Sequence, residues 1–146
     1  VTAAIDRVDH TLEPPHPLPE TVRMGPLTFL GHGLSSEHAS PGETLHLRTY
    51  WRVESLPNRA LSLMAHLVEP GGTTASVGDS LGFPIEQWQL DDIMVQEHRL
   101  AISQNASTGR YALHVGGYWL DTMKRWPVSG TATKDFLVVA SVEVVE

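Results

Sequence analysis

Cysteine is absent from the 146-residue sequence. A disulfide framework, a cysteine-ligated zinc site and a thiol nucleophile are therefore excluded. Long hydrophobic runs are missing as well, since no stretch approaches the roughly 20 consecutive apolar residues that a membrane-spanning helix requires. We expect no membrane insertion by this chain.

Positive charge is also scarce. Ten Lys and Arg residues stand against 17 Asp and Glu residues, which gives a formal net charge of −7. A net negative charge is unfavourable for binding the negatively charged phosphate backbone of nucleic acid. The basic residues also form no run that would bind an anionic membrane surface. We predict no nucleic-acid partner.

The chain does contain a regular alternation of apolar and polar residues. Hydrophobic residues make up 41% of the sequence, which suits one folded domain over residues 1–146. The period of two is typical of half-buried β-strands. In residues 43–53, Leu47 and Trp51 are expected to face the core, whereas Arg48 and Tyr50 are expected to face outward. The predicted strands cover residues 3–9, 26–34, 43–53, 60–68, 73–81, 93–102, 110–119 and 136–145.

These strands predict an all-β fold. The expected architecture is an antiparallel two-sheet β-sandwich, immunoglobulin-like or jelly-roll, with about eight or nine strands. No segment carries a clean helical period. The segment 11–23, with Pro14, Pro15, Pro17 and Pro19, is expected to be an extended connection, because proline lacks the N–H that a central strand donates.

Four phrases of the sequence carry a family resemblance. They are FLGHGLSSEHASPGETLHLRTYWRV (29–53), LMAHLVEPGG (63–72), WQLDDIMVQEHRL (88–100) and TGRYALHVGGYW (108–119). Together they resemble the accessory β-sandwich domain attached to bacterial, Chloroflexi-type, membrane-embedded glycosyltransferases of the protein O-mannosyltransferase type. The resemblance implies an extracytoplasmic module without catalytic residues, part of a larger membrane-attached or exported protein that handles sugars.

Aromatic residues near loops supply the candidate binding site. Flat rings stack on the apolar faces of sugars while neighbouring polar side chains bind the hydroxyls. The residues of this predicted glycan platform are Trp88, Tyr118, Trp119, Trp126, Gln87, Asp121 and Arg125. The alternative is that Trp88 and Trp126 plug the ends of the core. Trp51 is expected to anchor the core, and Tyr111 to form a tyrosine corner.

Two further constellations are weaker. His46, His66 and His114 share the outward parity of their strands, and they would converge on a metal only if those strands were neighbours. Their spacing gives no local support, so we predict neither a metal site nor a cofactor. Ser80, His66 and Asp79 are conceivable as a hydrolytic triad, but no nucleophile-presenting motif accompanies them.

The predicted function is a non-catalytic accessory module that binds carbohydrate or positions a glycosyltransferase. Its expected partners are a carbohydrate or the parent membrane protein. The alternative is a structural or protein–protein interaction domain that uses an exposed sheet edge or face. A small hydrolase is the third hypothesis. Neither the ligand nor the oligomeric state follows from the sequence.

Overall fold

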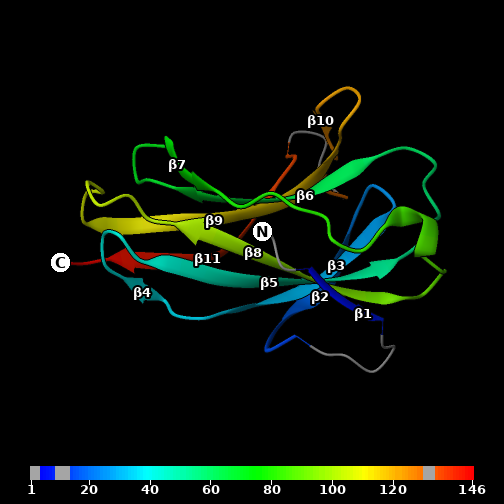
Figure 1. Cartoon of the computed structure of the whole chain (residues 1–146), viewed down its shortest axis with the longest axis horizontal. Coiled ribbons are helices and arrows are strands. Elements are labelled where there is room, and N and C mark those ends of the chain that lie inside the picture. Colours follow the sequence, from blue (N-terminus) through cyan, green and yellow to red (C-terminus); the bar gives the residue numbers. More distant parts are fainter. Residues whose placement is uncertain (1–3, 9–13, 130–133) are drawn as a thin grey trace.

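Two β-sheets lie face to face in the computed structural model, which describes residues 4–8, 14–129 and 134–146 (Figure 1). The strands of the described chain are β1 (Ala4–Val8), β2 (His16–Met24), β3 (Leu27–Leu34), β4 (His38–Ala39), β5 (Thr44–Val53), β6 (Leu61–Val68), β7 (Thr74–Val77), β8 (Ile93–Ala101), β9 (Gly109–Trp119), β10 (Lys124–Arg125) and β11 (Leu137–Val144). A single turn of 3-10 helix, η1 (Ile85–Gln87), precedes β8. Within these ranges no helix has the length and apolarity needed to cross a bilayer.

The pairing of the strands defines the sandwich. One sheet has the order β1-β8-β5-β3-β2, and the other has the order β4-β11-β9-β6-β7, with β10 also paired to β9. Neighbouring strands run antiparallel except β4 and β11, which are parallel. The predicted two-sheet β-sandwich is confirmed, and the short strands β4 and β10 are additions to the predicted set.

The core lies between the sheets and follows from the alternation in the strands. On β5, Leu47 and Trp51 are fully buried, and on β9 Leu113 and Val115 are fully buried as well. The Trp51 ring packs against that of Phe29 with ring centroids 4.8 Å apart. Because alternate residues of a strand point to opposite faces, both sheets turn their apolar faces inward. Trp51 is the core anchor that the sequence predicted.

The proline segment differs from its prediction. From residue 16 onward it forms β2, which pairs with β3 through an irregular register between Pro17 and Val22. This strand lies at the edge of its sheet, where a missing N–H leaves no interior pairing unmade. Gly31 makes room for the segment, because a Cβ at that position would overlap the backbone of His16.

A buried chain of hydrogen bonds connects the two sheets. Trp51 Nε1 donates to Thr49 Oγ1 at 2.8 Å, and the Thr49 hydroxyl lies 2.9 Å from His98 Nε2. The other ring nitrogen of His98, Nδ1, lies 2.7 Å from the carbonyl oxygen of Gly78. Since the carbonyl can only accept, the imidazole carries its proton on Nδ1 and accepts the threonine hydroxyl at Nε2. Burial lowers the pKa of His98 to about 4, so the ring is neutral at pH 7.

A tyrosine corner closes the turn before β9. The hydroxyl of Tyr111 donates to the carbonyl oxygen of Ser107 at 2.7 Å, and the ring is buried. This confirms the role predicted for Tyr111 and holds the β8–β9 turn against the core.

Candidate functional site

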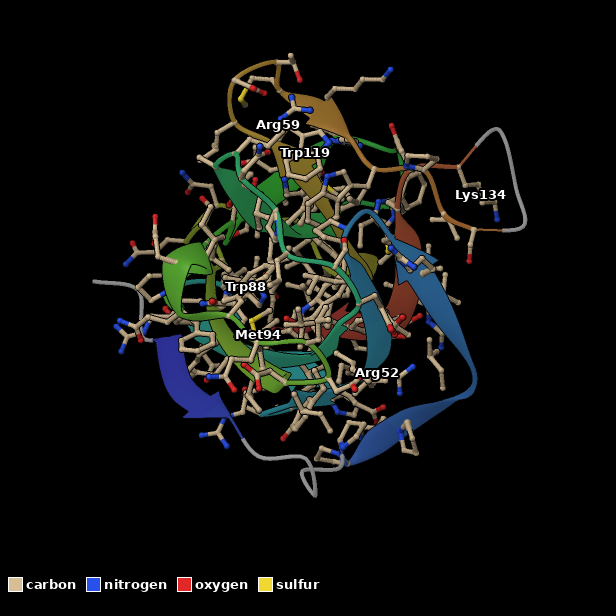
Figure 2. The ribbon with its side chains drawn as sticks, turned by 90° about the vertical axis from the view of Figure 1, so that its right-hand side faces the viewer. Arg52, Arg59, Trp88, Met94, Trp119 and Lys134 are labelled. Carbon is tan, nitrogen blue, oxygen red and sulfur yellow. The ribbon has the colours of Figure 1, made fainter. Side chains whose placement is uncertain are left out.

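The predicted glycan platform is divided between the core and the surface. Figure 2 looks onto the end of the sandwich where Trp88 and Trp119 lie, beside the β5–β6 loop, η1 and the β9–β10 hairpin. Trp88 is only 4% exposed, and its Nε1 donates to the carbonyl oxygen of Phe83 at 3.0 Å. Gln87 is exposed in η1. The Trp88 ring therefore closes the end of the core and offers no free face.

Trp126 is a second core plug. It is 2% exposed and lies against Gly25 and Gly117, where a Cβ at either position would overlap the indole ring. Its Nε1 has no hydrogen-bond partner in the part of the chain that the structure describes. Trp88 and Trp126 therefore plug the end of the core, which was the alternative to their predicted role in sugar binding. Large rings at the ends of strands cover the open end of a sandwich.

Trp119 is partly exposed but is covered by its own neighbours. The Arg59 guanidinium carbon lies 4.4 Å from the centroid of the Trp119 ring, and the Trp126 ring meets it edge-on at 5.4 Å. Arg59 also pairs with Asp121, and hydrogen bonding from Arg59 lowers the pKa of that carboxyl group. The face of Trp119 that would stack on a sugar is thus occupied by a guanidinium group.

Tyr118 and Arg125, the remaining platform residues, pair across β9 and β10 and face the outside of the β6–β9 sheet. There they line a pocket of about 210 Å³. We call it the β6–β9 pocket, and it is lined by Met64, His66, Asp79, Tyr118, Met123 and Arg125.

The polar groups of the β6–β9 pocket bind one another. Asp79 Oδ1 accepts the backbone N–H of Ala65 at 3.0 Å and lies 3.1 Å from His66 Nε2. Asp79 Oδ2 accepts the hydroxyl of Tyr118 at 3.0 Å. Burial alone would raise the pKa of Asp79, but its contacts with His66, Ala65 and Tyr118 outweigh that effect and lower the pKa. The carboxylate is already satisfied and has little left to offer a ligand.

The histidines and the serine singled out from the sequence do not form a metal site or a triad. His66 and His114 are direct cross-strand partners, but His46 lies on the other sheet. No group of three metal-ligating side chains occurs among the described residues. His66 contacts Asp79 as the triad hypothesis required, whereas Ser80 pairs through its backbone with the core-facing Leu63. Among the described residues, the Ser80 hydroxyl makes no hydrogen bond to His66 or Asp79.

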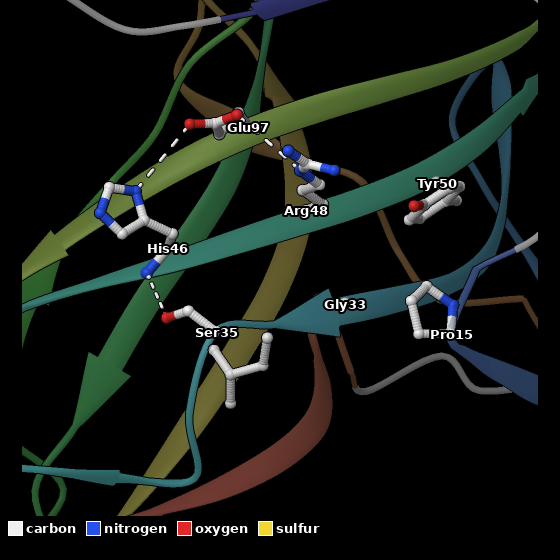
Figure 3. A pocket seen from close by; sticks show the side chains of 8 residues that line it. Pro15, Gly33, Ser35, His46, Arg48, Tyr50 and Glu97 are labelled. Atoms are coloured by element: carbon white, nitrogen blue, oxygen red, sulfur yellow. Dashed lines mark hydrogen bonds and ion pairs between the residues drawn. The ribbon is translucent and has the colours of Figure 1, made fainter.

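A larger pocket lies on the outer face of the other sheet (Figure 3). Its volume is about 420 Å³, within the range of small-molecule sites. We call it the β5–β8 pocket, and it is lined by Pro15, Gly33, Leu34, Ser35, His46, Arg48, Tyr50 and Glu97.

Strand register builds this pocket. Gly33, Arg48 and Glu97 lie side by side on β3, β5 and β8. Because Gly33 has no side chain, Pro15 lies over the sheet there, with its Cγ 3.2 Å from where a Cβ would be. Tyr50, two residues beyond Arg48, faces the same side of the sheet and is 8% exposed.

The charged side chains of the β5–β8 pocket face one another at distances longer than a hydrogen bond. Glu97 is 16% exposed, and its two carboxylate oxygens lie 3.9 Å from His46 Nδ1 and 3.8 Å from Arg48 Nε. Both distances exceed a hydrogen bond. Among the described residues, neither the Glu97 carboxylate nor the Tyr50 hydroxyl has a hydrogen-bond partner, although most of each side chain is buried. Solvent still reaches these oxygens, because Trp126 Nε1 is the one fully buried side-chain nitrogen or oxygen without a partner among the described residues.

Sequence reasoning missed this pocket because its residues have the parity of a solvated outer face. His46, Arg48 and Tyr50 were assigned outward, and that assignment is correct. The sequence feature that could have indicated the pocket was Tyr50, an aromatic residue between two arginines on a face expected to be exposed to solvent. The contribution of Glu97 depends on the pairing of β5 with β8, which alternation does not reveal.

The comparisons with known proteins bear on the fold. No family model matches the chain, and no curated protein matches it. Among solved structures it is similar to the crystal structure of the C-terminal domain of Wzt, with a TM-score of 0.58 and 11% sequence identity. The match covers 94% of this chain and 84% of that one. At this identity the likeness supports the β-sandwich, and attachment to a glycosyltransferase remains a prediction.

Proposed function

We propose that the chain is a non-catalytic binding module that holds a carbohydrate in the β5–β8 pocket. The observation that carries the proposal is the Glu97 carboxylate, largely buried beside Arg48 and the Tyr50 ring without a hydrogen bond among the described residues. A carboxylate that faces the pocket without a protein donor can accept hydrogen bonds from a ligand, and a ligand rich in hydroxyl groups supplies such donors.

The lining suits a sugar in two ways. The Glu97 carboxylate accepts hydroxyl hydrogens and the Arg48 guanidinium donates to hydroxyl oxygens, so the two planar groups together bind neighbouring hydroxyls on one ring. Pro15, which is exposed, offers apolar surface for the C–H face of a pyranose, whereas Tyr50 is 8% exposed and contributes only a small part of its surface to the pocket.

The test is a glycan array followed by isothermal titration calorimetry on the sugars that bind. Glu97→Gln and Arg48→Ala are each expected to weaken binding tenfold or more, because a hydrogen bond to a charged group contributes about 1.5–3 kcal/mol. Arg110→Ala is the matched control, since Arg110 pairs with Glu143 on the exposed face of the other sheet. An array without any bound glycan, or equal losses in the control, would contradict the proposal.

A binding role also agrees with the accessory module that the sequence resemblance implies, outside the cytoplasm and attached to a larger sugar-handling protein. Cell fractionation with an antibody against this chain would test the location. We expect the signal in the membrane or exported fraction, and a purely cytosolic signal would overturn this part.

A second candidate, a protein-interaction domain, is favoured by exposed apolar residues in the end loops. Leu56, Leu90, Leu120 and Met123 are 45–64% exposed and lie in the β5–β6, η1–β8 and β9–β10 connections. If this end docks the parent protein, Leu120→Lys would abolish co-purification with the parent and leave sugar binding intact. Unchanged co-purification would remove this candidate.

A further inference from the structure

We propose that the β5–β8 pocket binds an extended, uncharged oligosaccharide of two or more rings instead of a single sugar. This inference rests on the proposed function and narrows its ligand. It comes from the length of the pocket along β5, from the order of its apolar and polar groups, and from its charge.

The pocket is longer than one pyranose ring. His46, Arg48 and Tyr50 are alternate residues of β5, and all three line it. Since a strand rises about 3.3 Å per residue, the four steps from residue 46 to residue 50 extend the lining over about 13 Å. Figure 3 shows His46 and Ser35 toward one end and Tyr50 with Pro15 toward the other.

The two ends offer different chemistry. The exposed Pro15 and the small accessible part of Tyr50 form an apolar end, and Gly33 leaves the floor beside Pro15 without a side chain. At the other end, Ser35 Oγ accepts the backbone N–H of His46 at 3.0 Å, so the serine hydroxyl hydrogen is left to donate. A ring that packs on Pro15 cannot also reach Ser35 and His46. A second or third ring in the same chain would occupy that polar end.

The charges in the middle of the pocket cancel. Arg48 and Glu97 contribute one positive and one negative charge, and His46 adds a positive charge only when it is protonated. A uronate carboxylate in the middle of the pocket would compete with Glu97 for Arg48 and would lie close to the like charge of Glu97, which is unfavourable. An uncharged sugar ring satisfies both groups through its hydroxyls without introducing a new charge. We therefore infer a linear neutral oligosaccharide.

The experiment measures binding to a length series. Linear malto-, cello- and manno-oligosaccharides of one to five units are titrated by calorimetry, together with an oligouronate of matched length. The affinity is expected to rise at least tenfold from the monosaccharide to the trisaccharide of the preferred series and then to level off. The oligouronate is expected to bind at least tenfold more weakly than its neutral counterpart.

Variants show which end provides the gain. His46→Ala changes an exposed side chain, so the fold should be retained, and it is expected to remove most of the gain in affinity from the monosaccharide to the trisaccharide. Arg110→Ala serves as control and should preserve the full gain.

The outcomes separate this inference from the proposed function. Three results would overturn the extended neutral site while leaving carbohydrate binding in place. They are a monosaccharide that binds as tightly as the trisaccharide, a gain in affinity with length that His46→Ala does not reduce, and a preference for the oligouronate. Absence of binding to every oligosaccharide in solution and on the array would overturn the proposed function itself.

Discussion

The two outer faces of the sandwich each carry a pocket with a carboxylate, a histidine, an arginine and a tyrosine, yet the two pockets are built differently. In the β6–β9 pocket, Asp79 accepts hydrogen bonds at 3.0 Å from Ala65 and from Tyr118. In the β5–β8 pocket, the Glu97 carboxylate makes only ion pairs at 3.8 and 3.9 Å among the residues that the structure describes. The same residue types are therefore structural where they satisfy one another and available for a ligand where they do not.

The largest expected effect comes from acid, through the buried histidine between the two pockets. His98 has a pKa of about 4 in the folded protein, because burial disfavours its charged form, and an ordinary pKa of 6.5 when unfolded. The unfolded chain thus binds an extra proton between pH 6.5 and pH 4, and about 3 kcal/mol of unfolding free energy is lost as the pH falls through that window. Urea unfolding at several pH values measures this loss.

A direct readout complements the unfolding data. In an NMR titration, the His98 ring signals should show no protonation near pH 6.5 and should titrate near the folded-state pKa of about 4. Titration of His98 near pH 6.5 would contradict the buried neutral ring.

The next effect distinguishes the two carboxylates. Asp79→Ala removes the acceptor for Ala65 N–H and the Tyr118 hydroxyl, and we expect it to lower the unfolding free energy by about 2 kcal/mol. In the unmutated protein, the lowered pKa of Asp79 keeps this stabilisation present above pH 3.8, and it is lost as the pH falls further. Chemical denaturation at pH 7 gives the mutant value, and a change below 0.5 kcal/mol would show that the network is not structural.

A smaller effect is expected at the tyrosines. Tyr118→Phe deletes one hydrogen bond to Asp79 and should cost about 1 kcal/mol of unfolding free energy without altering sugar affinity. Tyr50→Phe deletes a hydroxyl that has no partner in the described chain, so it should leave stability almost unchanged. Equal losses of unfolding free energy in the two variants would show that the tyrosine hydroxyls of the two pockets contribute equally to stability, contrary to this prediction.

The smallest effect on stability is expected at Glu97. Glu97→Gln removes a charge that makes only long ion pairs, so the unfolding free energy should change by less than about 0.5 kcal/mol even though carbohydrate affinity falls. Comparing denaturation curves with titration data on one sample measures both quantities. A destabilisation as large as that of Asp79→Ala would make Glu97 a structural residue.

Much of the fold could be predicted, because alternation is a local property. The predicted strand 43–53 coincides with β5 to within one residue, and 60–68 coincides with β6 equally well. The error was in the segment 11–23, part of which forms β2. Proline excludes a central strand but is compatible with an edge strand, and a position at the edge is decided by the neighbouring strands.

The candidate site was less predictable. The sequence identifies Trp88 and Trp126 as large rings near loops, and nothing local distinguishes a surface ring from a plug. Trp126 is buried because Gly25 and Gly117, distant in sequence, leave space for its indole. Trp119 is covered because Arg59 reaches it from the β5–β6 loop. Both outcomes depend on packing between segments that are far apart along the chain.

By itself, the sequence determined the strand content, the inward and outward faces, the tyrosine corner at Tyr111 and the absence of cysteine chemistry, since each follows from residue type and local spacing. Only the tertiary structure decided which polar side chains meet. Strand order sets Arg48 beside Glu97 and His66 beside Asp79, and the distances between them determine whether their hydrogen bonds are already made. Hydrogen bonds act over about 3 Å, a scale that alternation along one strand does not encode.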